Sequence, residues 1–355
     1  MHLVVALSAH GYGHAAMTSP VVDRLRARLP GLRVTLRGAL PAELLRERFG
    51  AECGLQQTPC DVGISMASPF EQRLDESARA YGDFHADWGP RVKREADELA
   101  ALGANLVLAN VPYLPLAAAA QAGIPAVALA CLNWMDIYRH YFGARPEATR
   151  ILAEMRDAYA SARCILQPEP SMPMTDLPRR RPIGPIARLG TNRAAEIRVA
   201  LKLGRATRLV LLATGGVPYR IDFARWPRVP GVHWLLAPPY AGERDDMTET
   251  ARLAIALIDA VASADAIVGK PGYGTFTEAA CNGVPMLYVR RNDWPEEPYL
   301  VQWMQQHARA VEVPPASLAT GDLRAALDAL WAAPPKPPLA TTGADEAAEL
   351  ILASA

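Results

Sequence analysis

The sequence has few cysteines, no net charge and no long apolar run. Its five cysteines are scattered and form no Cys-x-x-Cys pair, which argues against a disulfide scaffold and predicts reduced, mostly buried thiols in a cytoplasmic protein. Lysine plus arginine and aspartate plus glutamate both number 37, so a nucleic-acid partner is not indicated. No run reaches transmembrane length, and residues 3–7 are too short for a signal peptide, while peripheral membrane contact stays open.

The chain is long enough and apolar enough to form two domains of ordinary size. Half of the 355 residues are apolar, and apolar strand-like runs alternate with helical patterns, which predicts an α/β fold with doubly wound sheets. Residues 168–185 combine many prolines with three consecutive arginines, a composition typical of a linker. We therefore expect an N-terminal domain over 1–167, a linker over 168–185, a C-terminal domain over 186–340 and a terminal helix over 341–355.

Residues 269–283 form the most informative stretch, because glycines stand between a predicted buried strand over 264–268 and a predicted helix. A glycine-rich turn before a helix gathers free N–H groups and partial positive charge, so it can hold phosphate. Thr275 or Thr277 could cap the helix or bind a phosphate oxygen. Glu278, expected in the first helical turn, could accept two hydrogen bonds from a ribose diol. The alternative is an ordinary helix start in which Glu278 only favours the dipole.

A second glycine loop follows the buried strand expected over residues 3–7. Gly11 and Gly13 lie in this loop, at the carboxyl end of a strand, where doubly wound folds bind ligands. His10 and His14 are four residues apart, but the glycine turn between them disfavours a helical pair of metal ligands. Each histidine could simply hold the loop.

Polar and aromatic side chains follow another predicted strand, over residues 125–130. Asn133, Trp134, Asp136 and Tyr138 combine an amide, an indole, a carboxylate and a phenol. Sugars bind through planar polar groups and aromatic faces, so this mixture suits an acceptor pocket. The alternative is a helix start with its aromatic residues in the core.

Two more predicted strand ends carry candidate groups. Gly215 and Gly216 follow an apolar strand over 208–213, and Arg290 or Arg291, after a strand over 286–289, could pair with a diphosphate. A helix is expected over residues 247–262.

Together these motifs resemble GT-B glycosyltransferases. Residues 269–283, followed by Val-Arg-Arg at 289–291 and Glu-Glu-Pro at 296–298, are similar to the donor half of MurG-type transferases. The pattern is more similar to the glycosyltransferase-like N-terminal region of plant L-arabinokinases, whose kinase half has no counterpart here. This second resemblance includes residues 59–64, in which we expect Asp61 to occupy a turn, and residues 133–141. The loop at 11–14 resembles the N-terminal glycine loop of the same GT-B relatives.

The resemblance implies two Rossmann-like domains facing across a cleft, with the terminal helix packed back on the first. It also implies metal-independent transfer of a sugar from a nucleotide-diphosphate donor, a UDP-sugar, to an unidentified acceptor with inversion. His14 is the expected catalytic base and Asp136 the competing candidate. The expected donor nucleotide and diphosphate contacts are Gly215, Gly216, Lys270, Gly272, Tyr273, Gly274, Thr275, Glu278, Arg290 and Arg291. Gly11, Gly13, Glu296 and Glu297 are expected near the donor sugar or cleft, and Asn133, Trp134 and Tyr138 near the acceptor.

Two departures from the family pattern are visible. Glu296 and Glu297 stand where MurG-like enzymes carry glutamines, which leaves the donor sugar open. Val217 replaces a small polar residue after the second glycine turn, so backbone N–H groups must carry that contact.

The sequence contains no Asp-x-Asp element, the usual metal–diphosphate bridge of the other major transferase fold, so neither a metal nor a cofactor is expected. The partners expected are small-molecule donor and acceptor. Two alternatives remain: an epimerase or hydrolase acting on the nucleotide sugar itself, and a non-catalytic nucleotide-sugar sensor.

Overall fold

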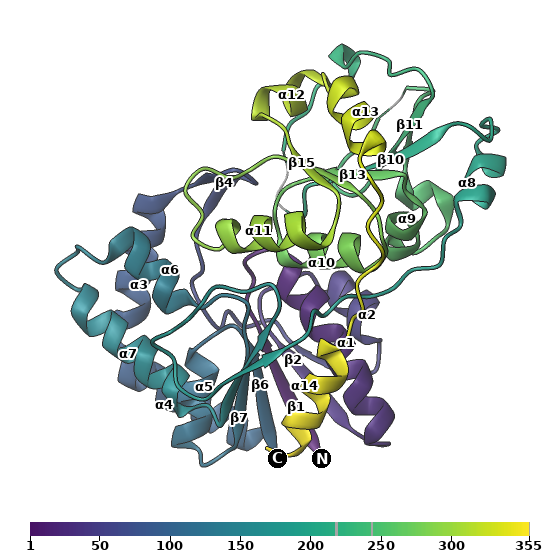
Figure 1. Cartoon of the computed structure of the whole chain (residues 1–355). Coiled ribbons are helices and arrows are strands. Elements are labelled where there is room, and N and C mark those ends of the chain that lie inside the picture. Colours follow the sequence, from purple (N-terminus) through teal and green to yellow (C-terminus); the bar gives the residue numbers. More distant parts are fainter. Residues whose placement is uncertain (217–218, 243, 355) are drawn as a thin grey trace. The chain divides into compact units, whose positions relative to one another are not determined.

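The computed structural model describes residues 1–216, 219–242 and 244–354 and divides into two compact α/β units (Figure 1). Unit 1 comprises Met1–Ser65, Gln72–Ile186 and Thr342–Ala355. Unit 2 comprises Met66–Glu71 and Ala187–Thr341. Val217 lies outside the described residues.

Unit 1 is organised around a seven-stranded parallel sheet in the order β3-β2-β1-β6-β7-β8-β9. Its central strands are buried on both faces, as parallel strands covered by crossover helices must be, which explains their continuous apolar runs. The strands are β1 (His2–Leu7), β2 (Arg33–Arg37), β3 (Gly54–Gln56), β6 (Leu106–Asn110), β7 (Ala126–Leu129), β8 (Cys164–Pro168) and β9 (Arg180–Ile183).

Helices cover both faces of this sheet. α14 lies beside α1, whereas α4, α5, α6 and α7 pack together (Figure 1). A two-stranded sheet of β4 (Met66–Ser68) and β5 (Glu71–Gln72) precedes α3. The helices of unit 1 are α1 (Gly13–Arg28), α2 (Ala42–Phe49), α3 (Leu74–Ala86), α4 (Trp88–Ala101), α5 (Leu114–Gln121), α6 (Trp134–Phe142), α7 (Ala148–Ser161) and α14 (Gly343–Leu352).

The segment 168–185 does not form a separate linker, because it contributes β9 to the edge of the unit 1 sheet. Proline is tolerated on edge strands, where one side of the ladder needs no N–H donor, so Pro182 is compatible with this position. The segment is also held near α14, since Gly343 N–H donates to the Pro185 carbonyl at 3.2 Å. Apart from Met66–Glu71, the chain therefore leaves unit 1 only after Ile186.

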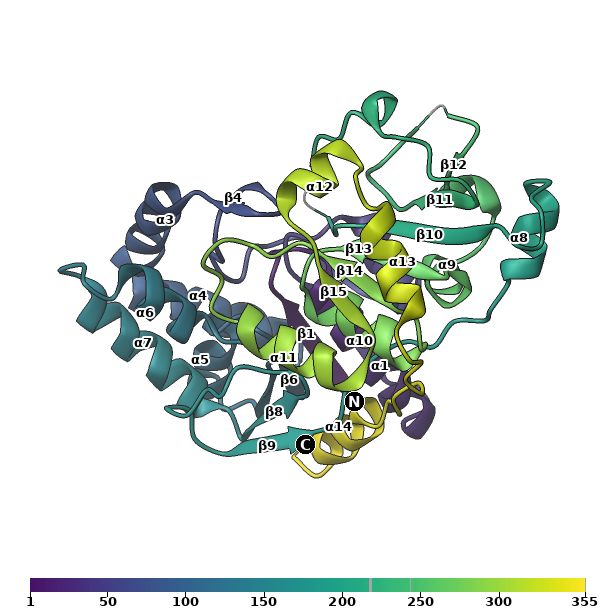
Figure 2. The same cartoon turned by 45° about the horizontal axis from the view of Figure 1, so that its top comes forward.

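Unit 2 has a six-stranded parallel sheet in the order β12-β11-β10-β13-β14-β15, and Figure 2 shows β10, β13, β14 and β15 side by side. Alternate residues of β10 enter opposite cores: Leu209 and Leu211 join one buried cluster, and Val210 and Leu212 the other. The strands are β10 (Arg208–Ala213), β11 (Val232–Leu236), β12 (Met247–Glu249), β13 (Ala266–Gly269), β14 (Met286–Tyr288) and β15 (Ala310–Glu312).

The prediction of one helix over residues 247–262 is wrong. Met247–Glu249 forms β12, which pairs with β11, and only Leu257–Ser263 is α-helical. The unit also contains the 3-10 turns η1 (Phe223–Arg225) and η2 (Thr250–Leu253). Its helices are α8 (Ala194–Ala200), α9 (Leu257–Ser263), α10 (Tyr273–Cys281), α11 (Glu297–His307), α12 (Pro315–Thr320) and α13 (Arg324–Ala332).

The strand order reverses once in each sheet, between β1 and β6 in unit 1 and between β10 and β13 in unit 2. Connections leave the two strands of such a pair in opposite directions and open a crevice at their carboxyl ends, where open α/β sheets bind ligands. Two of the three glycine stretches singled out in the sequence, at 11–13 and 215–216, follow β1 and β10, and the third, at 269–283, begins at the end of β13. Each sheet thus places glycine-rich segments at its switch point.

Two bulk expectations can be compared with the structure. All five cysteines are free and buried. In the part of the chain that the structure describes, no helix is long and apolar enough to cross a membrane.

Candidate functional site

The N-terminus of α10 lies at the switch point of unit 2. The helix starts at Tyr273, Gly272 is its N-cap in an extended conformation, and the Phe276 N–H makes the first helical bond, to the Gly272 carbonyl at 3.0 Å. The N–H groups ahead of Phe276 therefore lack acceptors within the helix and concentrate partial positive charge at this end. The start of α10 therefore has the free N–H groups and the partial positive charge that an anion-binding site requires.

Two side chains of the same stretch differ from expectation. Glu278 lies five residues after Tyr273, in the second turn of α10 and not the first. The Thr277 hydroxyl is buried and donates to the carbonyls of Tyr273 and Gly274, at 2.9 and 3.2 Å, so it is committed within the helix. Thr275, near the helix start and half-buried, is the hydroxyl left for a ligand.

Lys270 lies directly after β13 and against the glycine turn that follows the neighbouring strand β10. Gly215 has a φ of +87°, a conformation that favours glycine, and a Cβ there would lie 3.5 Å from Lys270 Cε. Within the described ranges, no hydrogen bond or ion pair holds the Lys270 ammonium. Burial, and next the cation of Arg291, lower the pKa of Lys270 to about 7, which Glu297 and Glu296 only partly oppose. The Lys270 amine, which can carry a positive charge, therefore lies at the switch point with little stabilisation from nearby carboxylates.

Arg291 is committed to the protein and not to a ligand. Its Nε donates to Glu297 Oε1 at 2.6 Å, its backbone N–H donates to the same carboxylate, and its Nη2 donates to the Pro271 carbonyl at 3.0 Å. The guanidinium also lies 4.3 Å from the centre of the Trp294 ring. This buried pair ties the start of α11 to the loop before α10 and so holds that loop in position.

The two glutamates expected near the donor sugar are buried. Glu297 is the partner of Arg291; burial raises its pKa and Arg291 opposes the shift. Glu296 accepts a hydrogen bond from the Trp294 indole at 3.1 Å. Arg290, by contrast, has a side chain that is 41% exposed, and its nearest carboxylate oxygens, on Glu297 and Glu312, lie at 3.8 and 3.9 Å. Of the two arginines, Arg290 is the one available to a diphosphate.

His14 lies in the first turn of α1, at the switch point of unit 1. Its Nδ1 is 2.9 Å from Oδ1 of Asn110, the last residue of β6. The Asn110 amide Nδ2 donates to the Thr18 hydroxyl at 2.8 Å, and that hydroxyl donates to the His14 carbonyl. This orientation makes Asn110 Oδ1 an acceptor, so His14 carries its proton on Nδ1 and presents a lone pair on Nε2.

Two residues near His14 were not recognised as functional from the sequence. Asn110 ends the strand next to β1, and a search for polar residues at strand ends would have found it. Asp61 has no local signal beyond its carboxylate, yet its Oδ2 accepts a hydrogen bond from the Trp134 indole at 2.6 Å. Burial raises the pKa of Asp61, while hydrogen bonds from Ser8 and Trp134 and the charge of His14 oppose that rise.

The residues expected to bind the acceptor have internal roles. Asn133 caps α6 by accepting from the Asp136 N–H at 2.8 Å, and its Nδ2 donates to Asp136 Oδ2 at 2.7 Å. Asp136 also pairs with Arg139 at 2.7 Å. Trp134 is fully buried, and Tyr138 packs on the Tyr81 ring at 5.0 Å. The core interpretation of this segment therefore fits better than the acceptor interpretation.

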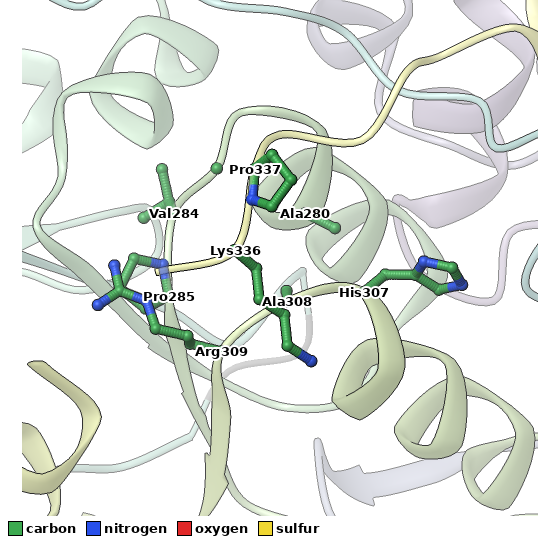
Figure 3. A pocket seen from close by; sticks show the side chains of 9 residues that line it. Ala280, Val284, Pro285, His307, Ala308, Arg309, Lys336 and Pro337 are labelled. Carbon is green, nitrogen blue, oxygen red and sulfur yellow. The ribbon is translucent and has the colours of Figure 1, made fainter. Parts of the chain in front are cut away.

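A small hollow in unit 2 lies at the opposite end of the sheet from these loops. Pro285 and Arg309, which line it, directly precede β14 and β15, so it sits at the amino ends of those strands (Figure 3). Lys336 Nζ donates to the carbonyls of Gln305 and Gln306 in the last turn of α11, so this ammonium group is already hydrogen-bonded within the protein. Nowhere in the described ranges do three or more His, Cys, Asp or Glu side chains gather in a way that could hold a metal.

Comparison with known proteins gives one curated relative and many similar structures. No known family profile matches the chain. The L-arabinokinase of Arabidopsis thaliana is 26% identical over 321 residues, which cover 88% of this chain and 30% of that protein. The chain thus spans about a third of the length of this relative.

The similar solved structures include three whose identities to this chain are 12–17%. The glycotransferase of kitacinnamycin has a TM-score of 0.61 and covers 99% of this chain and 94% of that one. The glycosyltransferase VinC, in complex with dTDP, has a TM-score of 0.55 with coverages of 100% and 95%. Arabidopsis thaliana UGT89C1, complexed with UDP, has a TM-score of 0.57 with coverages of 99% and 93%. These likenesses confirm the expected GT-B fold.

Proposed function

We propose that this protein is a glycosyltransferase that moves a sugar from a nucleotide-diphosphate donor to an acceptor hydroxyl. The observation that carries the proposal is the switch point of unit 2, where Lys270, the exposed Gly215 turn and the N-terminus of α10 converge in a GT-B fold. A diphosphate needs N–H donors and positive charge at close range, and these three elements supply both. The nucleotides named for two similar structures, UDP and dTDP, support this donor class.

Donor binding is assigned to unit 2. Backbone N–H groups of the Gly215–Gly216 turn and of the start of α10 would contact the diphosphate, together with the Lys270 ammonium and Arg290. Thr275 and Glu278 are three residues apart on α10, so they share one face of the helix. A diphosphate bound near Thr275 would therefore leave Glu278 beside the attached ribose, whose diol it can bind through two hydrogen bonds. We take the nucleotide to be uridine.

Deprotonation of the acceptor is assigned to His14. The Nε2 lone pair takes the proton of the acceptor hydroxyl as its oxygen attacks the anomeric carbon on the face opposite the diphosphate. A new carbon–oxygen bond forms, the bond to the diphosphate breaks, and the electron pair leaves with the diphosphate, which gives inversion. N–H groups and Lys270 stabilise the developing negative charge, so the proposal needs no divalent metal.

Ligand-linked thermal stabilisation against a panel of nucleotides and nucleotide sugars tests donor binding. We expect UDP-sugars to raise the melting temperature of the parent protein and to have little effect on Lys270→Met. Product analysis with a panel of hydroxyl acceptors then tests transfer. Products from donor alone would identify an epimerase or hydrolase, and binding without turnover across the panel would identify a sensor. Either result contradicts the transferase proposal.

A further inference from the structure

The base proposed above lacks a charged partner on its Nδ1 side. Asn110 fixes the tautomer of His14, but a neutral amide contributes no charge when the ring becomes an imidazolium. An imidazolium formed in a largely buried site is costly unless a negative charge lies nearby. The reaction therefore calls for an anion close to His14 but outside its hydrogen bond to Asn110.

We propose that Asp61 is the positioning residue that supplies this charge. Asn110 then fixes the tautomer of His14, while Asp61 stabilises the imidazolium. The inference rests on the proposed transferase function. Asp61 reaches the site through Trp134, whose indole N–H donates to it and whose ring centre lies 6.4 Å from that of His14. The Ser8 hydroxyl, directly after β1, helps to oppose the rise in the pKa of the same carboxyl group.

The surroundings of Asp61 support this division. In the described part of the chain, no arginine or lysine pairs with the partly buried Asp61, although a carboxylate withdrawn from solvent is usually paired. Its charge helps to raise the pKa values of the Cys60 thiol and of the phenols of Tyr81, Tyr113 and Tyr159, none of which can supply a positive charge. His14 is the group that opposes the rise in the Asp61 pKa through its charge. Once it is protonated, the His14 ring is thus the natural counter-ion of this carboxylate.

The proton balance is simple. The acceptor proton moves to His14 Nε2, Nδ1–H continues to donate to Asn110, and Asp61 stays ionised with its hydrogen bond from Trp134 intact. Asp61 neither binds the substrate nor takes the proton, so it acts only through His14.

A titration that needs no enzymatic activity tests the electrostatic link. Carbonyl-carbon NMR of protein labelled at aspartate, with Asp61 assigned through Asp61→Asn, follows this carboxyl group in the parent, in His14→Ala and in His10→Ala. His10 is the matched control, because its ring also packs on Trp134, at 5.3 Å. We expect the pKa of Asp61 to rise in His14→Ala, and to rise less in His10→Ala. An unchanged pKa in His14→Ala overturns the inference, whether or not the protein is a transferase.

A kinetic cycle tests the catalytic consequence. Asp61→Asn keeps an acceptor for Trp134 and removes the charge, so kcat should fall about 10- to 100-fold while donor affinity is retained. In a His14→Ala background the same substitution should change kcat no further, because the group it serves is absent. Adding Asn110→Asp to Asp61→Asn should restore part of kcat, because it places a negative charge next to the imidazolium of His14. Equal losses in both backgrounds would show a merely structural role and overturn the inference.

Discussion

Binding of a nucleotide sugar should cause Lys270 to take up a proton. In the free protein, burial and the Arg291 cation lower the pKa of Lys270 to about 7 from the usual 10.5. A bound diphosphate would place two negative charges beside the ammonium and return its pKa towards the usual value. Above pH 7 the free protein is mostly deprotonated at Lys270 and the complex is protonated, so binding takes up a proton from solution.

The size of the effect follows from the two pKa values of Lys270. At pH 8 the free lysine is about 10% protonated and the bound lysine almost fully so, which gives uptake of about 0.9 proton per donor bound. At pH 6 the free lysine is already about 90% protonated, and uptake falls to about 0.1 proton. Donor affinity should therefore be nearly constant below pH 7 and fall about tenfold for each further pH unit above it.

Calorimetry in buffers of different ionisation enthalpy measures this uptake directly. A UDP-sugar is the suitable ligand, because its diphosphate is esterified at both ends and does not titrate in this range. Lys270→Arg is the matched control: it keeps the charge but stays protonated, so it should bind with no uptake at pH 8. Lys270→Met should bind weakly at every pH. Uptake below about 0.2 proton at pH 8 in the parent protein would refute the reasoning.

Further predictions concern single residues of the site and its independence of metal. Glu278→Ala should cost about 2–4 kcal/mol of nucleotide binding by calorimetry, and undiminished affinity in the folded variant would remove Glu278 from the site. His14→Ala should lower turnover by about 10²–10⁴-fold with donor affinity retained. Asp136→Asn should change kcat little, and the opposite pattern would make Asp136 the base. Turnover should persist in EDTA, so rescue by magnesium or manganese after its loss would contradict metal independence. Glu297→Gln removes the hydrogen-bonded anion of buried Arg291 and leaves only the more distant Glu296 carboxylate, at 4.0 Å, so it should lower the free energy of unfolding in urea by about 3–5 kcal/mol.

Much of the fold could be predicted from local sequence. The apolar runs of β1, β10 and β13 belong to strands buried on both faces, and each is followed by the glycines or polar residues of a candidate site loop. The positions of Gly215 and Lys270 next to strand ends could be read for the same reason, because a strand end is a local feature.

Elements without a local signature were misassigned. α10 begins at Tyr273 behind Gly272, which has no capping side chain, so the sequence offered no marker for the first turn and Glu278 was placed one turn too early. β9 contains proline and two arginines, and only its pairing with β8 makes it a strand. β12 likewise exists because β11 provides its hydrogen-bond partners.

The sequence by itself determined the strand–glycine–helix segments, since backbone propensity and apolar periodicity act over a few residues. Tertiary structure alone decided which polar side chains meet. Asp61 and Trp134 are 73 positions apart, and His14 and Asn110 are 96 apart, yet each pair forms a hydrogen bond. Burial also decided that Arg291 and Glu297 satisfy each other, because an unpaired charge in the core is too costly, while Lys270 kept no such partner among the described residues.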